Sequence, residues 1–192
     1  MNHPIWTVTS KKEEKFLRTK TVLVQFSPKG EPILNGKPAN RTDIAKLLNN
    51  MRRVMKLAEG IGLSANQIGL PYRLFVAEVP GAQGEKKSYA IFNPELEKSG
   101  SDEIILEEGC LSVPGYYGEV ARASQVILKG RDKQGKPIKI KAWGLLARVF
   151  QHEVDHLNGM LFLNKAKNIQ QLTPEQHREM KKRREQLITD NR

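Results

Sequence analysis

The sequence contains a single cysteine among its 192 residues, so the chain cannot form an internal disulfide. This scarcity indicates a reducing compartment, for which we expect the cytoplasm, and it leaves the thiol of Cys110 free for chemistry. No apolar run approaches the roughly 20 residues that a transmembrane helix needs. Residues 1–16 also lack the apolar segment of a secretory signal. We therefore expect no membrane partner.

Repeats, low-complexity tracts and linkers are absent too, and a chain of this length can bury a sizeable core as one domain. Hydrophobic residues make up 39% of it and charged residues 28%, which is an ordinary globular balance. The net charge is +11 and the pI about 9.8. This excess fits an anionic partner such as RNA or a ribosome, although many enzymes are equally basic. We expect no DNA partner.

The spacing of apolar residues predicts an α+β fold. Helical periodicity begins near Thr42, a suitable N-cap, and stops before Gly60. Alternating patterns predict strands over 21–26, 73–79, 88–94, 102–107, 119–129 and 136–142, with a turn at 132–135 between the last two. Further helices are expected over 144–158 and 174–188. We expect antiparallel sheets packed around a central buried helix at 144–158, with one helix N-terminal and one C-terminal to them.

Residues 151–159, QHEVDHLNG, contain the pattern His-Glu-x-x-His. On a helix, His152 and His156 lie one turn apart on the same face and can both reach one metal ion. Glu153 lies about 100° round the helix from His152, beside the ion yet outside its ligands. A general base for an attacking water has to sit there. Matches this short also occur in proteins without a metal, so a third ligand is needed.

Two upstream segments supply further candidates. Cys110 lies in EEGCLSVPG, and a divalent ion held by two nearby imidazoles would convert its thiol to a thiolate and recruit it. One cysteine with two histidines leaves a fourth position open, as catalytic sites do. Gln67 lies in GIGLSANQIG and offers an amide N–H suited to an oxyanion. That segment lacks the later glycine of a dinucleotide-binding loop, which argues against a nucleotide site.

Taken in order, GIGLSANQ, EGCLS and QHEVDH resemble the three signature motifs of the peptide deformylases. The 42 positions between Cys110 and His152 also match that family, and the resemblance covers roughly residues 40–165. It implies a metal-dependent enzyme that removes the formyl group from the initiator methionine of nascent chains and releases formate. The implied ion is Fe²⁺, with Zn²⁺, Ni²⁺ or Co²⁺ as substitutes, since imidazole and thiolate suit all of them.

The resemblance also implies a division of the chain and a set of partners. Residues 1–20 would form an N-terminal arm, 21–172 a single catalytic domain, and 173–192 a basic C-terminal helix and tail. The expected partners are N-formylmethionyl nascent peptides and the ribosome near its exit tunnel. The basic helix, which includes KKRRE at 181–185, would contact the ribosomal RNA.

The same resemblance assigns roles to individual residues. The expected metal ligands are Cys110, His152 and His156, with Glu153 as the acid and base. Gln67 and the backbone N–H of Leu111 are the expected oxyanion donors. The peptide is expected to add as a strand against Ile61–Gly62 and Gly109–Leu111. Side chains expected to line the methionine pocket are those of Ile61, Leu145 and Val149. Arg122 is expected to pair with Glu108.

Two features depart from the family pattern. The first motif usually reads Ala-Ala-Pro-Gln, and here it is Ser64-Ala65-Asn66-Gln67. Gln67 keeps its place, so the departure concerns the subclass rather than catalysis. Arg148 falls where the family commonly has an apolar pocket residue. We expect its side chain to point to solvent rather than to sit at the pocket rim and favour acidic peptides.

Two alternative functions fit parts of the sequence. A peptidase could take its third ligand from Glu175, which follows His156 by 19 positions, although residues 173–176 also resemble a helix-capping box. A non-enzymatic RNA- or ribosome-binding protein could carry a structural metal, although the upstream motifs offer only one thiol toward the four ligands that such a site needs.

Overall fold

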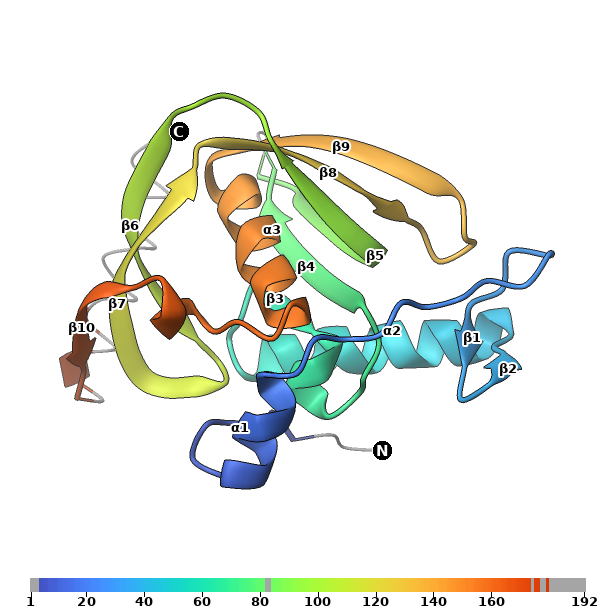
Figure 1. The fold of residues 1–192 in the computed structure, drawn as a ribbon, viewed down its shortest axis with the longest axis horizontal. Coiled ribbons are helices and arrows are strands. Elements are labelled where there is room, and N and C mark those ends of the chain that lie inside the picture. The colour runs from blue at the N-terminus through green and yellow to red at the C-terminus, as the bar shows by residue number, and fades with distance from the viewer. Residues whose placement is uncertain (1–3, 82–83, 174, 177–178, 180–192) are drawn as a thin grey trace.

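The computed structural model describes residues 4–81, 84–173, 175, 176 and 179, and its elements are arranged as Figure 1 shows. The helices and strands are α1 Lys11–Leu17, β1 Ile33–Leu34, β2 Lys37–Pro38, α2 Arg41–Leu57, β3 Gly62–Ser64, β4 Leu74–Pro80, β5 Lys86–Lys98, β6 Glu103–Cys110, β7 Val113–Ala123, β8 Gln125–Arg131, β9 Pro137–Trp143, α3 Gly144–Leu157 and β10 Lys167–Gln171. Short 3₁₀ helices cover Ala65–Ile68 and Phe162–Asn164. Within the described ranges, no helix is long and apolar enough to cross a membrane.

The strands form antiparallel sheets, which confirms the α+β class. The larger sheet has the order β3-β4-β5-β8-β9, the second has the order β10-β7-β6, and β1 pairs with β2. Strands β3 and β6 are therefore the terminal strands of their sheets, each with one edge that makes no ladder within its sheet. In Figure 1, α3 lies between the sheet that contains β6 and β7 and the one that contains β4 and β5.

Helix α3 is fixed by its apolar residues. Ala147, Val149, Phe150, Val154 and Leu157 join a buried cluster with side chains from β4, β5, β8 and β9. Phe150 is fully buried and packs at 5.4–5.7 Å, centroid to centroid, from the rings of Tyr89 and Phe75. Burial of such a side chain contributes about 1.5–3 kcal/mol. The helix that carries both histidines is thus set firmly against the larger sheet.

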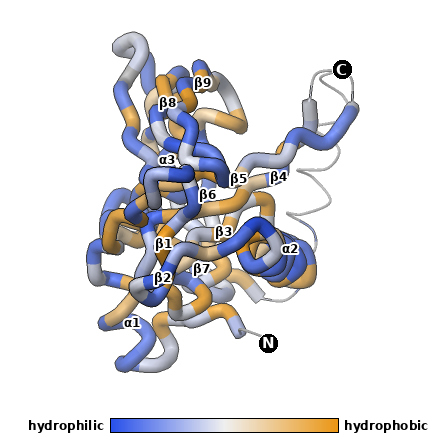
Figure 2. The backbone as a smooth tube through the Cα atoms, turned by 90° about the vertical axis from the view of Figure 1, so that its right-hand side faces the viewer, coloured by the Kyte–Doolittle hydropathy of each residue, from blue (hydrophilic) through white to orange (hydrophobic). Residues whose placement is uncertain are grey.

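Helix α2 covers the other side of β4. Its buried residues recur at helical spacing (Ile44, Leu48, Met51, Val54 and Met55), and Figure 2 shows that the helix carries both hydrophobic and hydrophilic residues. The N-cap is Asn40 rather than the expected Thr42, because the Asn40 side chain accepts a hydrogen bond of 2.9 Å from the backbone N–H of Asp43. The helix positions the turn that leads into β3.

Some expected elements differ in the structure. Residues 21–26 do not form a strand of any sheet and make only isolated β-bridges, at Val22 and Phe26. The backbone of Val24 instead pairs with the side-chain amide of Asn93, at 2.8 Å in both directions, which replaces a backbone ladder. The strand expected over 119–129 is divided at Ser124 into β7 and β8, which belong to different sheets. The turn at 132–135 is confirmed by the antiparallel pairing of β8 with β9.

The N-terminal arm expected over residues 1–20 contains a short helix and packs against the rest of the chain. Residues 11–17 form α1, whose Leu17 is fully buried. The backbone N–H groups of Trp6 and Val8 donate to the carbonyls of Gln67 and Ser112, at 2.7 and 2.9 Å. The segment therefore lies against the loops that carry Gln67 and follow Cys110. The helix expected over 174–188 falls largely outside the described residues.

Candidate metal and catalytic site

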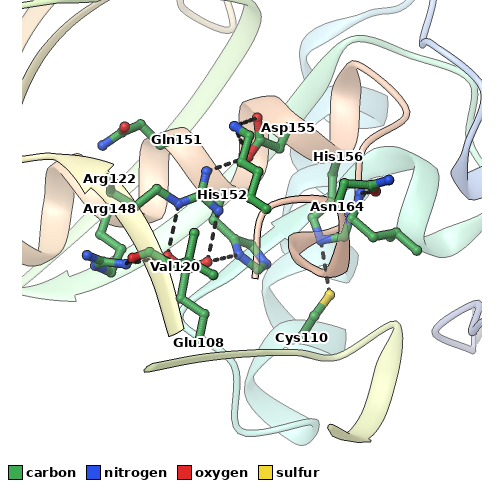
Figure 3. Close-up of polar contacts among 12 residues, drawn as sticks. Glu108, Cys110, Val120, Arg122, Arg148, Gln151, His152, Asp155, His156 and Asn164 are labelled. Carbon is green, nitrogen blue, oxygen red and sulfur yellow. Dashed lines mark hydrogen bonds and ion pairs between the residues drawn. The ribbon is translucent and has the colours of Figure 1, made fainter. Parts of the chain in front are cut away.

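Three side chains that are distant in the sequence converge at one point. Cys110 ends β6, while His152 and His156 lie on one face of α3 (Figure 3). Their ligand atoms all lie within 4.8 Å of one another, and Cys110 Sγ is 3.1 Å from His156 Nε2. Metal–ligand bonds of about 2.0–2.3 Å would place one ion within reach of all three atoms. The described residues include no other group that could hold a metal in this way.

Glu108 fixes the orientation of His152. Its Oε2 lies 3.0 Å from His152 Nδ1. Burial would raise the pKa of Glu108, but hydrogen bonds from Arg122 and His152 hold that pKa well below its usual range. An ionised carboxylate only accepts, so Nδ1 must donate its proton to it. The lone pair of a neutral imidazole then lies on Nε2, which is available to a metal.

The electrostatics of the three donors also fit a cation. Burial would raise the pKa of the Cys110 thiol, but the nearby His156 and His152 lower that pKa to about 5. Reciprocally, burial would lower the pKa of His152, but Cys110 and Glu108 raise it to about 10. The thiolate therefore requires positive charge beside it, which protonated imidazole supplies when no metal is bound. A divalent ion would replace that proton and leave both imidazoles neutral.

Behind the three donors lies a buried network of charges that is centred on Glu108. Arg122 donates to both carboxylate oxygens of Glu108, at 2.9 and 2.8 Å, and also pairs with Asp155. The pairing of Arg122 with Glu108 is confirmed. Asp155 in turn accepts from Lys165 at 2.7 Å. Replacing one member of such a network leaves an uncompensated charge in a buried place.

Arg148 belongs to the same network, so our expectation that it points to solvent is wrong. The residue is only 9% exposed. Its guanidinium donates to Glu108 Oε1 at 2.6 Å and to the carbonyl of Val120 at 3.1 Å (Figure 3). It also donates to the carbonyl of Ile104, at 2.6 Å. A guanidinium with these partners joins α3 to β6 and β7, and it shares the carboxylate of Glu108 with Arg122.

We expect the substitution Glu108→Ala to lower the free energy of unfolding of the metal-free protein by about 3–5 kcal/mol, because Arg122 and Arg148 lose a buried counter-charge. The matched control is Glu97→Ala, which removes an exposed ion pair with Lys129 and should change that free energy by less than about 1 kcal/mol. Urea unfolding in the presence of a chelator measures both. Equal values for the two variants would contradict a structural role of the network.

Glu153 lies beside the three donors but is not one of them. It is 3% exposed and extends from α3 toward β3. A Cβ added at Gly62 would lie 2.2 Å from Glu153 Oε1, so any larger residue there would require this carboxylate to move from its position. Ser64 Oγ lies 2.7 Å from the other oxygen, Oε2. Burial raises the pKa of Glu153, while the two histidines and Ser64 oppose the rise, which suits a group that both takes and returns a proton.

The side-chain amide nitrogen of Gln67 points toward Cys110, one of the three donors. Gln67 Oε1 accepts a hydrogen bond of 2.9 Å from the backbone N–H of Ser64, which leaves Nε2 facing Ser112 Oγ at 3.1 Å and Cys110 Sγ at 3.8 Å. The side chain is 1% exposed and so is held in one orientation. Leu111 follows Cys110 directly and packs against the α2 cluster, the buried apolar residues of α2 together with those of β3 and β4 that contact them. Both expected oxyanion donors therefore lie next to Cys110.

The residues expected to bind substrate are distributed around the site. Gly62 lies on terminal strand β3, with Ile61 just before it, and Gly109 lies on terminal strand β6. Ile61 and Leu145 are about 40% exposed, whereas Val149 is 5% exposed and belongs to the core. A cavity of about 130 Å³ near the start of α3 is lined by Ile104, Leu106, Arg122, Ala123, Ser124, Gly144, Leu145 and Arg148. Of the three expected pocket residues it includes only Leu145.

Several contributors to the site were not identified from the sequence. Arg148 and Asp155 lie four positions before and three positions after the predicted ligand His152 on α3, and like His152 they bond to the Glu108–Arg122 pair. That spacing was a usable indication of one charged face. Ser64 and Ser112 gave no such indication, because a buried serine that bonds a functional side chain has no pattern of its own.

Comparison with known proteins gives a consistent result. The family model described as polypeptide deformylase matches residues 21–172. A peptide deformylase of Halothermothrix orenii is 45% identical over 152 residues, which cover 77% of this chain and 96% of that protein. One from Carboxydothermus hydrogenoformans is 49% identical over 145 residues, 73% of this chain and 91% of the relative.

Solved structures resemble the chain over most of its length. The peptide deformylase of Thermotoga maritima aligns with a TM-score of 0.71 and 28% identity, covering 87% of this chain and 99% of that one. A class I type b peptide deformylase of Acinetobacter baumannii, solved with Met-Ala-Ser bound, aligns with a TM-score of 0.70 and 30% identity, covering 86% and 98%. The chain belongs to the peptide deformylases, metal-dependent hydrolases that remove the formyl group from nascent polypeptides.

Proposed function

We propose that Cys110, His152 and His156 hold one divalent ion, and that α3 is the central, metal-bearing helix around which the antiparallel sheets pack. The observation that carries this proposal is the convergence of the three ligand atoms within 4.8 Å, with His152 oriented by Glu108. When bound, the ion supplies Lewis-acid chemistry that acidifies a water and polarises the formyl carbonyl. One thiolate and two imidazoles leave a position open for this chemistry.

The residues around the three donors carry out the proton transfers and stabilise the negative charge that develops during the reaction. Glu153 takes a proton from water as the water oxygen attacks the formyl carbon. Gln67 Nε2 and the backbone N–H of Leu111 donate hydrogen bonds to the oxygen on which negative charge develops. The C–N bond then breaks, and Glu153 returns its proton to the leaving amine. The products are formate and a peptide with a free amino terminus.

We propose that the substrate lies as an added strand between Gly62 on β3 and Gly109 on β6. The terminal position of both strands in their sheets supports this mode, because each offers an edge for backbone hydrogen bonds. Ile61, Leu145 and Val149 would contact the methionine side chain. The peptide-bound relative from A. baumannii supports a peptide as the ligand of this fold.

The test of this function is release of formate from formyl-Met-Ala-Ser by the metal-loaded protein. We expect turnover that is lost after treatment with a chelator and regained when a divalent ion is added back. A protein that binds metal stoichiometrically but releases no formate would contradict the proposal and would favour a structural metal.

A thiol as the third donor also distinguishes this centre from that of a peptidase that uses Glu175. Glu175 is exposed beside the capping pair Thr173–Gln176.

We propose Fe²⁺ as the native ion, with Zn²⁺, Ni²⁺ or Co²⁺ able to occupy the same donors. A ferrous centre exposed to oxygen should oxidise, so the activity of protein purified in air is expected to decay. Reductant or replacement by Ni²⁺ should prevent the decay, as measured by repeated assays of one preparation under air. Full, oxygen-stable activity in a zinc-loaded preparation would contradict the ferrous assignment.

We also propose that the enzyme acts in the cytoplasm on chains leaving the ribosome, and that the basic segment near residue 181 contacts ribosomal RNA. Phosphate contacts release counterions, so binding must weaken as salt rises. We expect a variant of this segment to bind ribosomes more weakly, with a flatter salt dependence, and to hydrolyse a short formyl peptide normally. The variant replaces Lys181, Lys182, Arg183 and Arg184 with Ala.

A second variant controls for the change in net charge. It replaces four exposed lysines in and after α1 with Ala, namely Lys11, Lys12, Lys15 and Lys20. Cosedimentation with ribosomes over a salt series compares the three proteins. Docking through the basic segment predicts that only the first variant loses affinity. Equal loss in both variants would indicate a general effect of charge.

A further inference from the structure

Ser64 stands where the first motif of the family usually has alanine, and we expected this departure to leave catalysis unaffected. In the structure its hydroxyl makes a contact with Glu153 that the mechanism above does not use. Ser64 is fully buried at the end of β3, and its Oγ lies 2.7 Å from Glu153 Oε2 and 3.0 Å from the backbone carbonyl oxygen of Glu153. Both acceptors belong to one residue of α3. A hydrogen bond from a hydroxyl to a carboxylate is charge-assisted, and it is stronger in a buried place than in water.

Gly62 and Ser64 act on the two carboxylate oxygens separately. They are two positions apart on β3, so both face α3, while Leu63 between them faces the α2 cluster. Oε1 of Glu153 lies where a side chain at Gly62 would be, and Oε2 lies against the hydroxyl of Ser64. The first residue provides space and the second provides a donor.

We infer that Ser64 is a positioning residue for Glu153: its hydroxyl anchors Oε2, so that Oε1 is the oxygen that receives the proton of the attacking water. This inference rests on the proposed function of Glu153. Without the anchor, the carboxylate can rotate about its last side-chain torsion, which is broad in glutamate. Proton transfer requires the base within hydrogen-bond reach of the water, so rotation away from that position slows the reaction.

Ser64 also connects the two polar groups of the site. Its backbone N–H donates to Gln67 Oε1 at 2.9 Å and so directs Gln67 Nε2 toward Cys110, while its hydroxyl directs Glu153. Substitution of the side chain removes only the second contact, because every residue but proline retains the backbone N–H. The hydroxyl can therefore be tested without altering the orientation of Gln67.

The experiment compares the metal-loaded wild type with the variants Ser64→Ala and Ser64→Thr. We expect Ser64→Ala to lower kcat for formyl-Met-Ala-Ser by about 10-fold, the size of one charge-assisted hydrogen bond, with KM changed less than about twofold. Metal content should be unchanged. Ser64→Thr keeps the hydroxyl, and its β-branched side chain suits the extended backbone at φ −86° and ψ 149°, so its kcat should lie closer to the wild type.

A purely structural role for this hydroxyl, through its bond to the Glu153 carbonyl, would lower thermal stability and leave kcat intact. Two further measurements separate the possibilities. In a double-mutant cycle, Ser64→Ala should have no further effect in a Glu153→Gln background, because its effect acts through that carboxylate. Crystal structures should show the Glu153 carboxylate turned away from its wild-type position in Ser64→Ala.

Unchanged kcat in a folded, metal-loaded Ser64→Ala variant would overturn the inference, as would a full effect in the Glu153→Gln background or a folded Ser64→Thr variant no better than Ser64→Ala. These results leave the proposed function untouched as long as the wild type releases formate. Failure of the metal-loaded wild type to do so would instead refute the proposed function itself. The two failures are therefore distinguishable in one series of assays.

Discussion

Cys110→Ala is expected to yield a folded protein that no longer retains its metal ion and releases no measurable formate. The substitution removes the only thiolate of the three-donor group and leaves two imidazoles. Loss of a residue that merely orients a ligand costs about 10–100-fold in metal affinity, so loss of a ligand itself should cost more than about 100-fold. Metal analysis after gel filtration, together with thermal unfolding, measures retention and folding separately.

The matched control for this experiment is Glu175→Ala. Glu175 has the spacing after His156 at which some metallopeptidases place a third ligand, but it lies on the exposed segment beside Thr173 and Gln176. We expect Glu175→Ala to retain its metal at the wild-type ratio. If only the Glu175 variant lost metal, the assignment of Cys110 would be wrong and the chemistry would be that of a peptidase site.

The helix over residues 144–158 was predictable because its local sequence pattern and its packing in the core favour the same structure. The apolar residues of α3 recur at helical spacing, and the same spacing places His152 and His156 on one face. Cys110 was identified by chemistry, since two imidazoles need a third donor and the chain has one thiol. The pairing of Glu108 with Arg122 came from the resemblance, and the structure confirms it.

Other features depend on partners that no local pattern specifies. Arg148 lies within an apolar helical pattern, and its burial is explained by partners distant in the sequence, which are the carboxylate of Glu108 and the carbonyls of Ile104 and Val120. Residues 21–26 have the alternation of a strand, yet Val24 bonds to the side chain of Asn93 because β5 has an irregular register between Phe92 and Glu95. The hydroxyl of Ser64 likewise became informative only when Glu153 was placed beside it.

Glu153→Gln is expected to retain the metal ion and to lose about 10²–10⁴-fold in kcat, the usual contribution of a positioned acid and base. Glutamine has the size of glutamate, so it fits the space beside Gly62, and its amide can still contact the Ser64 hydroxyl. It cannot accept the proton of an attacking water. KM should change little, because Glu153 is not among the groups expected to bind the peptide.

The matched control is Glu107→Gln, which makes the same chemical change at an exposed position of β6. Formate release and metal content are measured on the same metal-replete preparations of the wild type and both variants. Glu107→Gln should match the wild type in both measurements. A Glu153→Gln variant that retains its metal and turns over at a near wild-type rate would show that the proton is taken by another group. In that case the roles of Gly62 and Ser64 in holding this carboxylate would also have to be reassigned, since both depend on Glu153 as the base.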